Sequence, residues 1–189
     1  MKQLVLSFAP PEKWRNPRQI KKLEGKKWRE FRKRILERDN CTCAYCGYKS
    51  QKYQIVDHID GNPENNSDSN IQVICQMCNL IKHVGQGCEV QAVVDLYRKS
   101  KYNQNAIIKI TRKMRDEGSN DIEIIKVLEL KEKVPFKMDL GYLRRLFGFV
   151  SSRQPLEKDM YYHWLNYHNQ KLKNENQKVV KQDAQKRIF

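Results

Sequence analysis

Two Cys-x-x-Cys pairs constrain the fold of this chain more than any other feature. Cys43 and Cys46 form the first pair, Cys75 and Cys78 form the second, and 28 residues separate the pairs. Two residues between cysteines let one tight turn present both thiolates to a metal ion, and four thiolates are a ligand set of structural zinc. We therefore predict that zinc joins the pairs and closes the segment between them.

The state of the thiols depends on the compartment. The apolar run at residues 4–9 is shorter than the core of a secretory signal, so we expect an intracellular protein, cytoplasmic or phage-encoded, with reduced thiols. A redox dithiol is the alternative for a single pair, but two pairs favour zinc. Cys41 could compete with Cys43 as a ligand; we expect Cys41 and Cys88 to be small buried thiols.

The charge of the chain predicts a polyanionic partner. The 189 residues include 37 Lys and Arg against 22 Asp and Glu, a net charge of +15, and this charge excludes a membrane span. Residues 1–40 hold 13 basic and 5 acidic residues, residues 41–90 hold 3 and 5, and residues 91–189 hold 21 and 12. Two basic arms around a slightly acidic centre favour phosphate contacts in the arms. Ordinary solvated faces, or binding to an anionic membrane surface, are the alternatives.

Hydrophobic periodicity predicts the elements of the centre. One apolar stripe indicates an amphipathic helix over 26–38. Two β-branched runs, over 54–59 and 71–74, predict strands joined by a loop of turn-forming residues. A helix follows the second cysteine pair. The centre therefore reads as strand, strand, helix, after a Pro-rich N-terminal arm with a short strand near residues 4–8.

The centre resembles the HNH nuclease family over roughly residues 28–84. The motif that carries the resemblance consists of the acid-His pair Asp57-His58, then Asn70, then Asn79 directly after the second cysteine pair. The resemblance implies the ββα-metal fold. Most members of the family have His where this chain has Asn79, but an amide oxygen is also a hard metal ligand, and His83 is the alternative at this position.

Hydrolysis of a phosphodiester needs a base for the attacking water and positive charge at the phosphate and the leaving oxygen. A neutral imidazole can accept a proton at physiological pH, and Mg²⁺ or Mn²⁺ prefers oxygen ligands. We therefore predict His58 as general base, Asp57 and Asn79 as ligands of one divalent cation, and Asn70 as the residue that orients His58. Lys82 is a predicted phosphate contact.

The flanks are predicted to bind DNA. Helical patterns cover 90–97, 105–117, 121–130 and 139–149, and the last of these exposes Arg144 and Arg145 before Arg153, as in a helix-turn-helix unit. A plain helical bundle is the alternative. In the N-terminal arm, Arg15 and Arg18 are predicted to contact a groove, although such arms are often only tails.

These predictions define an α+β fold with a zinc-stabilised ββα-metal core, a basic N-terminal arm and an all-α, helix-turn-helix C-terminal region. The predicted domains are an arm at 1–25, a nuclease domain at 26–100, a helical DNA-binding region at 101–155, and a helix with a polar tail at 156–189. The predicted function is a site-specific DNA endonuclease of restriction or homing type. It would cut double-stranded DNA to 5′-phosphate and 3′-hydroxyl ends. The alternative is a noncatalytic zinc-stabilised nucleic-acid-binding module, and the sequence leaves open whether the chain acts as a homodimer.

Overall fold

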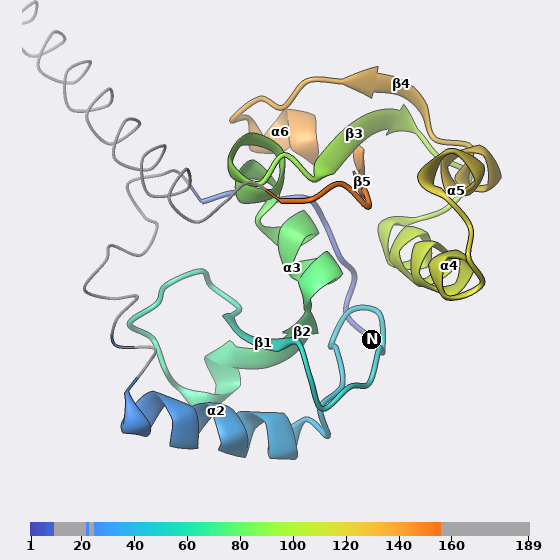
Figure 1. Cartoon of the computed structure of the whole chain (residues 1–189). Coiled ribbons are helices and arrows are strands. Elements are labelled where there is room, and N and C mark those ends of the chain that lie inside the picture. The colour runs from blue at the N-terminus through green and yellow to red at the C-terminus, as the bar shows by residue number, and fades with distance from the viewer. Residues whose placement is uncertain (10–21, 23–24, 156–189) are drawn as a thin grey trace, which may run out of the picture.

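The structure is a computed structural model that describes residues 1–9, 22 and 25–155 (Figure 1). Three predictions lie outside the described residues: the contacts of Arg15 and Arg18, and the C-terminal helix over 156–189. Among the described residues, no helix is both long and apolar enough to cross a membrane.

A hairpin and helix α2 form the bottom of the molecule in Figure 1, and α3 rises from them toward the second half. Strands β1 and β2 pair antiparallel, with Asp57 opposite Gln72. The loop between them ends in a short 3-10 helix, and the next helix begins directly after β2. The predicted strand, strand, helix order is therefore confirmed. The elements are α2 (Lys26–Arg38), β1 (Gln54–His58), η2 (Asp68–Asn70), β2 (Ile71–Cys75) and α3 (Gln76–Lys82).

Helix α2 covers one face of the hairpin through the predicted apolar stripe. Ile35 is fully buried in a cluster with residues of both strands, and Trp28 and Phe31 pack against this cluster. The basic side chains of α2 also hold the hairpin, because Arg32 donates a hydrogen bond to the Gln54 carbonyl (2.6 Å) and Arg38 donates one to the Ile71 carbonyl (2.8 Å). The helix thereby supports the strand that carries Asp57 and His58.

A three-stranded antiparallel sheet forms the second half, with the strand order β4-β3-β5. Helices α4 and α5 pack beside this sheet, in a cluster that includes Ile107, Ile124 and Phe149. Asn120 caps α5 with a full capping box. The elements are η3 (Gln86–Val90), β3 (Val94–Lys99), α4 (Gln104–Asp116), α5 (Asp121–Leu128), β4 (Lys131–Val134), α6 (Leu140–Leu143) and β5 (Phe147–Val150).

The prediction of an all-α C-terminal region is wrong. The helices predicted over 105–117 and 121–130 are present, but the one over 139–149 is reduced to the four residues of α6, and β5 follows it. Strand β3 (Val94–Lys99) replaces the second half of the helix predicted over 90–97. The predicted helix-turn-helix unit that ends with Arg144 and Arg145 does not form, because β4 separates α5 from the four-residue α6. The reason is tertiary: the apolar residues of 94–99 and 147–150 are buried by pairing with each other.

Helix α3 and the N-terminal segment connect the two halves (Figure 1). Leu4 and Leu6 are buried, and the Lys2 amide donates to the Ala44 carbonyl. The segment is extended, but the strand predicted near residues 4–8 does not form. The halves also pack closely at Gly148 of β5, where a Cβ atom would lie 2.6 Å from Ile81 Cδ1 of α3. The domain boundaries predicted from the sequence stay predictions.

Candidate active site and zinc centre

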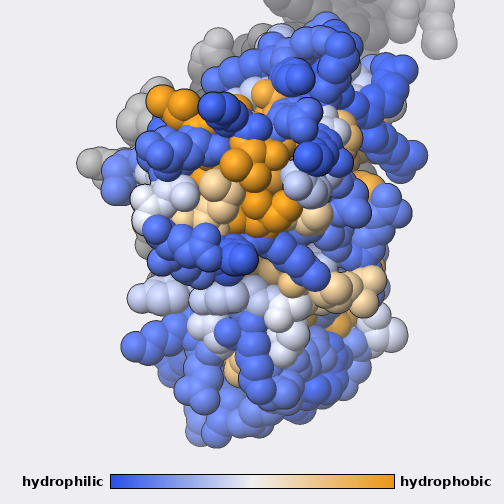
Figure 2. Space-filling model, turned by 90° about the vertical axis from the view of Figure 1, so that its right-hand side faces the viewer, coloured by the Kyte–Doolittle hydropathy of each residue, from blue (hydrophilic) through white to orange (hydrophobic). Residues whose placement is uncertain are grey.

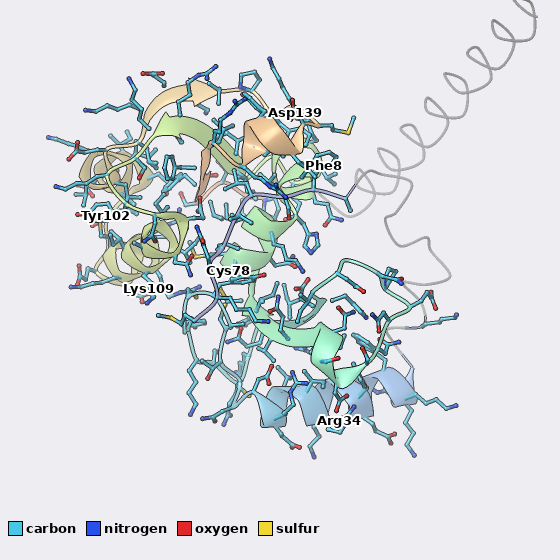
Figure 3. The ribbon with its side chains drawn as sticks, turned by 180° about the vertical axis from the view of Figure 1, so that it is seen from behind. Phe8, Arg34, Cys78, Tyr102, Lys109 and Asp139 are labelled. Carbon is cyan, nitrogen blue, oxygen red and sulfur yellow. The ribbon has the colours of Figure 1, made fainter. Side chains whose placement is uncertain are left out.

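The structure brings the four cysteines of the two pairs together. The Sγ atoms of Cys43, Cys46, Cys75 and Cys78 all lie within 4.8 Å of one another, and all four residues are buried. Cys46 Sγ lies 3.6 Å from Cys75 Sγ. This spacing fits a tetrahedral zinc ion with Zn–S bonds of about 2.3 Å. Figure 3 shows Cys78 near the junction of the two halves.

The four neighbouring thiols shift one another's pKa values. Hydrogen bonds from the neighbouring thiols lower the pKa of Cys43, while those of Cys75 and Cys78 are raised, chiefly by Cys43. Four thiolates so close together repel one another, and a divalent cation would offset that repulsion. The donor set therefore suits zinc.

Arg112 of α4 contacts the four-cysteine cluster from the second half of the molecule. Its Nη2 atom lies 3.4 Å from Cys75 Sγ, and its guanidinium carbon lies 3.7 Å from the centre of the Tyr48 ring. Tyr48 belongs to the loop that follows the first pair, where its carbonyl accepts a hydrogen bond from the Cys43 amide. Arg112 therefore bridges the two cysteine pairs, and the sequence analysis missed it.

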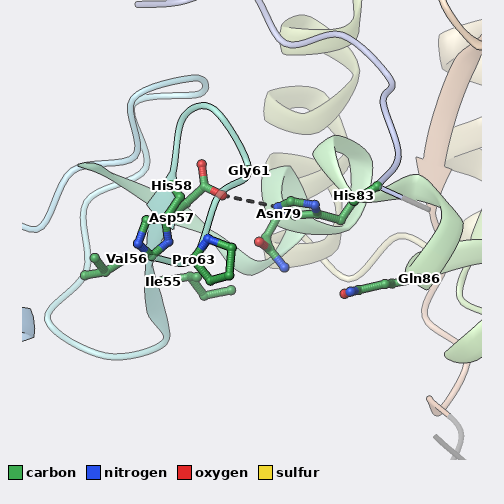
Figure 4. A pocket seen from close by; sticks show the side chains of 10 residues that line it. Ile55, Val56, Asp57, His58, Gly61, Pro63, Asn79, His83 and Gln86 are labelled. Atoms are coloured by element: carbon green, nitrogen blue, oxygen red, sulfur yellow. Dashed lines mark hydrogen bonds and ion pairs between the residues drawn. The ribbon is translucent and has the colours of Figure 1, made fainter. Parts of the chain in front are cut away.

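The acid-His pair lines a cavity of about 190 Å³ (Figure 4). Asp57 and His58 reach it from the end of β1, while Asn79 and His83 reach it from α3 and the residue after it. Both elements are fixed by the hairpin, because α3 starts where β2 ends. The cavity lining consists of Ala9, Ile55, Val56, Asp57, His58, Gly61, Pro63, Asn79, His83 and Gln86.

The carboxylate of Asp57 is buried and accepts hydrogen bonds at both oxygens. Oδ2 accepts from Lys82 Nζ (2.5 Å) and Gln72 Nε2 (2.9 Å), and Oδ1 lies 3.2 Å from His83 Nε2. Burial acts to raise the pKa of Asp57, but the His83 hydrogen bond and the Lys82 charge outweigh it and hold this pKa below its usual value. Asp57 is therefore an anion that can face a cation in the cavity.

His58 ends β1, and Asn70 holds the loop that follows. His58 Nε2 lies 3.0 Å from Asn66 Oδ1 in that loop. Asn70 Oδ1 accepts from the Asp60 amide, and its Nδ2 donates to the Asn65 carbonyl (2.8 Å). The Asn70 side chain therefore ties both ends of the loop, which is consistent with an orienting role.

The other predicted site residues lie in different surroundings. Lys82 is nearly buried, and its ammonium points to Asp57 rather than to solvent. Arg144 and Arg145 are exposed just after α6. Arg153 makes a two-fold ion pair with Asp95, with both N···O distances 2.9 Å. Contacts of these residues with DNA stay predictions.

Sequence reasoning also missed Gln72. Gln72 lies opposite Asp57 in the hairpin register, and its Nε2 links Asp57 to the Tyr45 hydroxyl (3.1 Å). The sequence could have pointed to Gln72, because two strands that flank one loop pair as a hairpin. A polar residue opposite a buried carboxylate is then expected to donate a hydrogen bond to that carboxylate.

Comparison with known families agrees with this geometry. Residues 43–85 match the HNH endonuclease family, and this range begins at the first cysteine pair and includes the hairpin and α3. The chain therefore carries an HNH endonuclease domain, a class that indicates nucleic acid as ligand, and its α+β, ββα core is as predicted.

A similar protein is the type 4 apparatus protein DotN of Legionella pneumophila. It is 31% identical to this chain over 85 residues, which cover 42% of this chain and 38% of DotN. The match thus spans well under half of the relative's length. The likeness does not extend to the whole of either protein.

Proposed function

We propose that this protein is a metal-dependent DNA endonuclease that hydrolyses phosphodiester bonds with one divalent cation. One observation carries the proposal: Asp57 and His58 end the same strand and line one cavity with Asn79. A base and an anionic metal ligand that face a common space are the groups that this hydrolysis requires. The match of residues 43–85 to the HNH endonucleases supports it.

In the proposed mechanism, His58 takes the proton from the attacking water. Consecutive residues of a strand point to opposite sides, so His58 and Asp57 can approach a phosphate from two directions. The carboxylate oxygen of Asp57 and the amide oxygen of Asn79 would hold Mg²⁺ or Mn²⁺, which supplies positive charge at the phosphate and the leaving oxygen. Oxygen donors at one cavity fit such a cation. Asn70 orients His58 by fixing the loop.

We propose structural zinc at the four-cysteine centre. Zinc there would fix the two ends of the segment that carries the acid-His pair, so that its role is to hold the hairpin rather than to react. Arg112 would stabilise the negative charge of the four thiolates by its hydrogen bond to Cys75.

We further propose that the substrate is double-stranded DNA, cut at specific sites to 5′-phosphate and 3′-hydroxyl ends, as in restriction or homing enzymes. Arg144 and Arg145 are exposed and could reach DNA, although they follow a four-residue helix rather than a recognition helix. The net charge of +15 supports a polyanionic ligand. Contacts by Arg15 and Arg18, and an intracellular location, remain part of this proposal.

A noncatalytic nucleic-acid-binding module is the second candidate function. It is favoured by the three protein groups that already surround the Asp57 carboxylate, among them the ammonium of Lys82. The relative DotN carries the name of an apparatus protein. If this chain resembled it in role, the domain would contribute binding to an assembly rather than hydrolysis.

Incubation with supercoiled plasmid separates the two candidates. The zinc-loaded chain is mixed with plasmid and Mg²⁺, Mn²⁺ or EDTA, and the DNA ends are then sequenced. The endonuclease proposal predicts nicked or linear DNA only with the divalent cation, and ends that accept ligation without prior phosphorylation. Binding in a gel-shift assay without any cleavage would instead support the module.

A further inference from the structure

We propose that Lys82 is a built-in cation of the candidate active site. It weakens the affinity of Asp57 for a divalent metal and adds positive charge once that metal is bound. The effect on metal affinity follows from the geometry alone, whereas the effect on turnover rests on the proposed endonuclease function.

Lys82 is the last residue of α3, and its side chain turns inward. Its Nζ atom lies 2.5 Å from Asp57 Oδ2 and 2.6 Å from the His58 carbonyl oxygen. The Lys82 side chain is only 11% exposed, and that of Asp57 is 4% exposed. One ammonium group therefore binds both residues of the acid-His pair.

This contact leaves one oxygen of the carboxylate for the cavity. Lys82 and Gln72 both donate to Oδ2, while Oδ1 faces His83 (Figure 4). A cation in the cavity would therefore meet Asp57 through Oδ1. The carboxylate that it meets is already neutralised by an ammonium group in a nearly dry environment, where charges are weakly screened.

Two opposite effects follow from the charge of Lys82. An arriving divalent cation is repelled by the ammonium, so the affinity of the site is lower than that of a lone carboxylate. The transition state of phosphodiester hydrolysis carries more negative charge than the substrate, so the same ammonium favours it. A role in folding alone would not produce this pair of effects, because a disordered site would lose both metal binding and turnover.

The test is a titration of the zinc-loaded full chain with Mn²⁺. The electron paramagnetic resonance signal of free Mn²⁺ measures how much of the metal is bound. Lys82→Met, which removes the charge and keeps the length, is expected to bind Mn²⁺ at least about tenfold more tightly than the wild type. Lys82→Arg keeps the charge and should stay within about threefold of it. Lys113→Met removes a lysine charge from the exposed face of α4 and should leave the affinity unchanged.

Lys82→Gln is the second neutral variant, because Met removes one of the hydrogen-bond donors of the buried Asp57 and leaves Gln72 and His83 in place. Unchanged or weaker Mn²⁺ binding in both neutral variants would overturn the proposal, and so would a failure of every variant to bind Mn²⁺. Plasmid cleavage at saturating Mn²⁺ should fall at least about tenfold in Lys82→Met. If the wild type does not cleave DNA, the proposed function fails, but the binding comparison still decides the effect of Lys82 on the metal.

Discussion

Asn79 and His83 lie one helical turn apart, and both side chains line the cavity beside Asp57. An amide oxygen suits Mg²⁺ better than an imidazole nitrogen, so we predict that Asn79 is the ligand. Asn79→Ala is expected to raise the Mg²⁺ concentration for half-maximal cleavage at least about tenfold, and His83→Ala is expected to raise it less.

Gln86→Ala is the matched control, because Gln86 lines the same cavity without contacting Asp57. It should leave the Mg²⁺ dependence unchanged. A larger shift in His83→Ala than in Asn79→Ala would show that the imidazole takes the position of the metal ligand.

For single residues, the sequence predicts which groups can do chemistry better than it predicts which residues those groups contact. Asp57 and His58 are neighbours at the end of a predicted strand, so the acid-His pair is visible in the sequence. Their common cavity is not, because consecutive strand residues point to opposite sides. The inward direction of Lys82 is not visible either, since its position one turn after Asn79 fits a phosphate contact equally well. Only the packing of α3 against β1 shows that Lys82 meets a buried carboxylate.

The four-cysteine cluster joins the loop before β1 to the start of α3, so loss of a zinc ion bound there should affect the whole hairpin. Cys78→Ser is expected to release the zinc and to unfold the hairpin, because one of four ligands is removed. Elemental analysis should give about one zinc per chain in the wild type and far less in this variant.

Cys88→Ser is the control, because Cys88 lies outside the four-cysteine cluster and burial raises its pKa to about 12. It should retain zinc, and its thiol in the wild type should react slowly with iodoacetamide at pH 8. Recovery of the complete fold of the wild type in metal-free buffer would refute a structural role of zinc.

Helix α4 contacts the sulfur atom of Cys75 through Arg112. Arg112→Met removes the hydrogen bond to Cys75 and the charge above Tyr48, and we expect zinc transfer to a chelator to become at least about tenfold faster. Lys109→Met is the control, because Lys109 lies three residues earlier on α4 and lines one surface cavity together with Arg112. It should transfer zinc at the wild-type rate. Equal rates of zinc transfer for Arg112→Met and the wild type would contradict a role of this contact in holding zinc.

The elements divide into those that local pattern predicts and those that it does not. The helix over 26–38, the hairpin and α5 with its Asn120 cap follow from periodicity and capping. Strand β5 (Phe147–Val150) was predicted as helix, because its four apolar or small residues continue the pattern of α6. Strand β4 (Lys131–Val134) is mostly exposed and gives almost no apolar signal. Both strands exist because β3 pairs with them, and such long-range pairing is not visible in a local window.

At the scale of the whole molecule, the two halves share one hydrophobic core. The N-terminal segment places Leu4 and Leu6 in one core with Ile81 of α3 and Leu96 of β3. Figure 2 shows the side that carries α4 and α5, where apolar side chains gather among hydrophilic ones. Because this one buried core contains residues from both halves, we expect the HNH domain and the three-stranded sheet to unfold together.

Asp95 of β3 forms ion pairs with Arg153 and Lys133 in the second half of the molecule. Its carboxylate accepts hydrogen bonds from Arg153 and lies 2.9 Å from Lys133 Nζ. Burial acts to raise the pKa of Asp95, but these cations outweigh it and lower that pKa. Asp95→Asn is expected to lower the free energy of unfolding by about 1–2 kcal/mol at pH 7.

Because the pKa of Asp95 is lower in the folded chain than in the unfolded one, its contribution is complete above the unfolded value of about 3.9 and is lost as the pH falls through the folded value. The stability difference between Asp95→Asn and the wild type should therefore shrink in acid. Urea unfolding at several pH values measures it, with Asp116→Asn on the exposed end of α4 as control. A difference that is the same at every pH would contradict the assignment.

We propose above all that His58 activates water for metal-dependent cleavage of DNA. The most direct measurement compares His58→Ala with the wild type, both zinc-loaded, in Mg²⁺-dependent cleavage of supercoiled plasmid and in DNA binding without Mg²⁺. We predict that cleavage falls at least about 100-fold while DNA affinity and zinc content stay within about threefold, because the base acts on water and contributes little to binding. Cleavage by His58→Ala at the wild-type rate, or no cleavage by the wild type, would contradict the account.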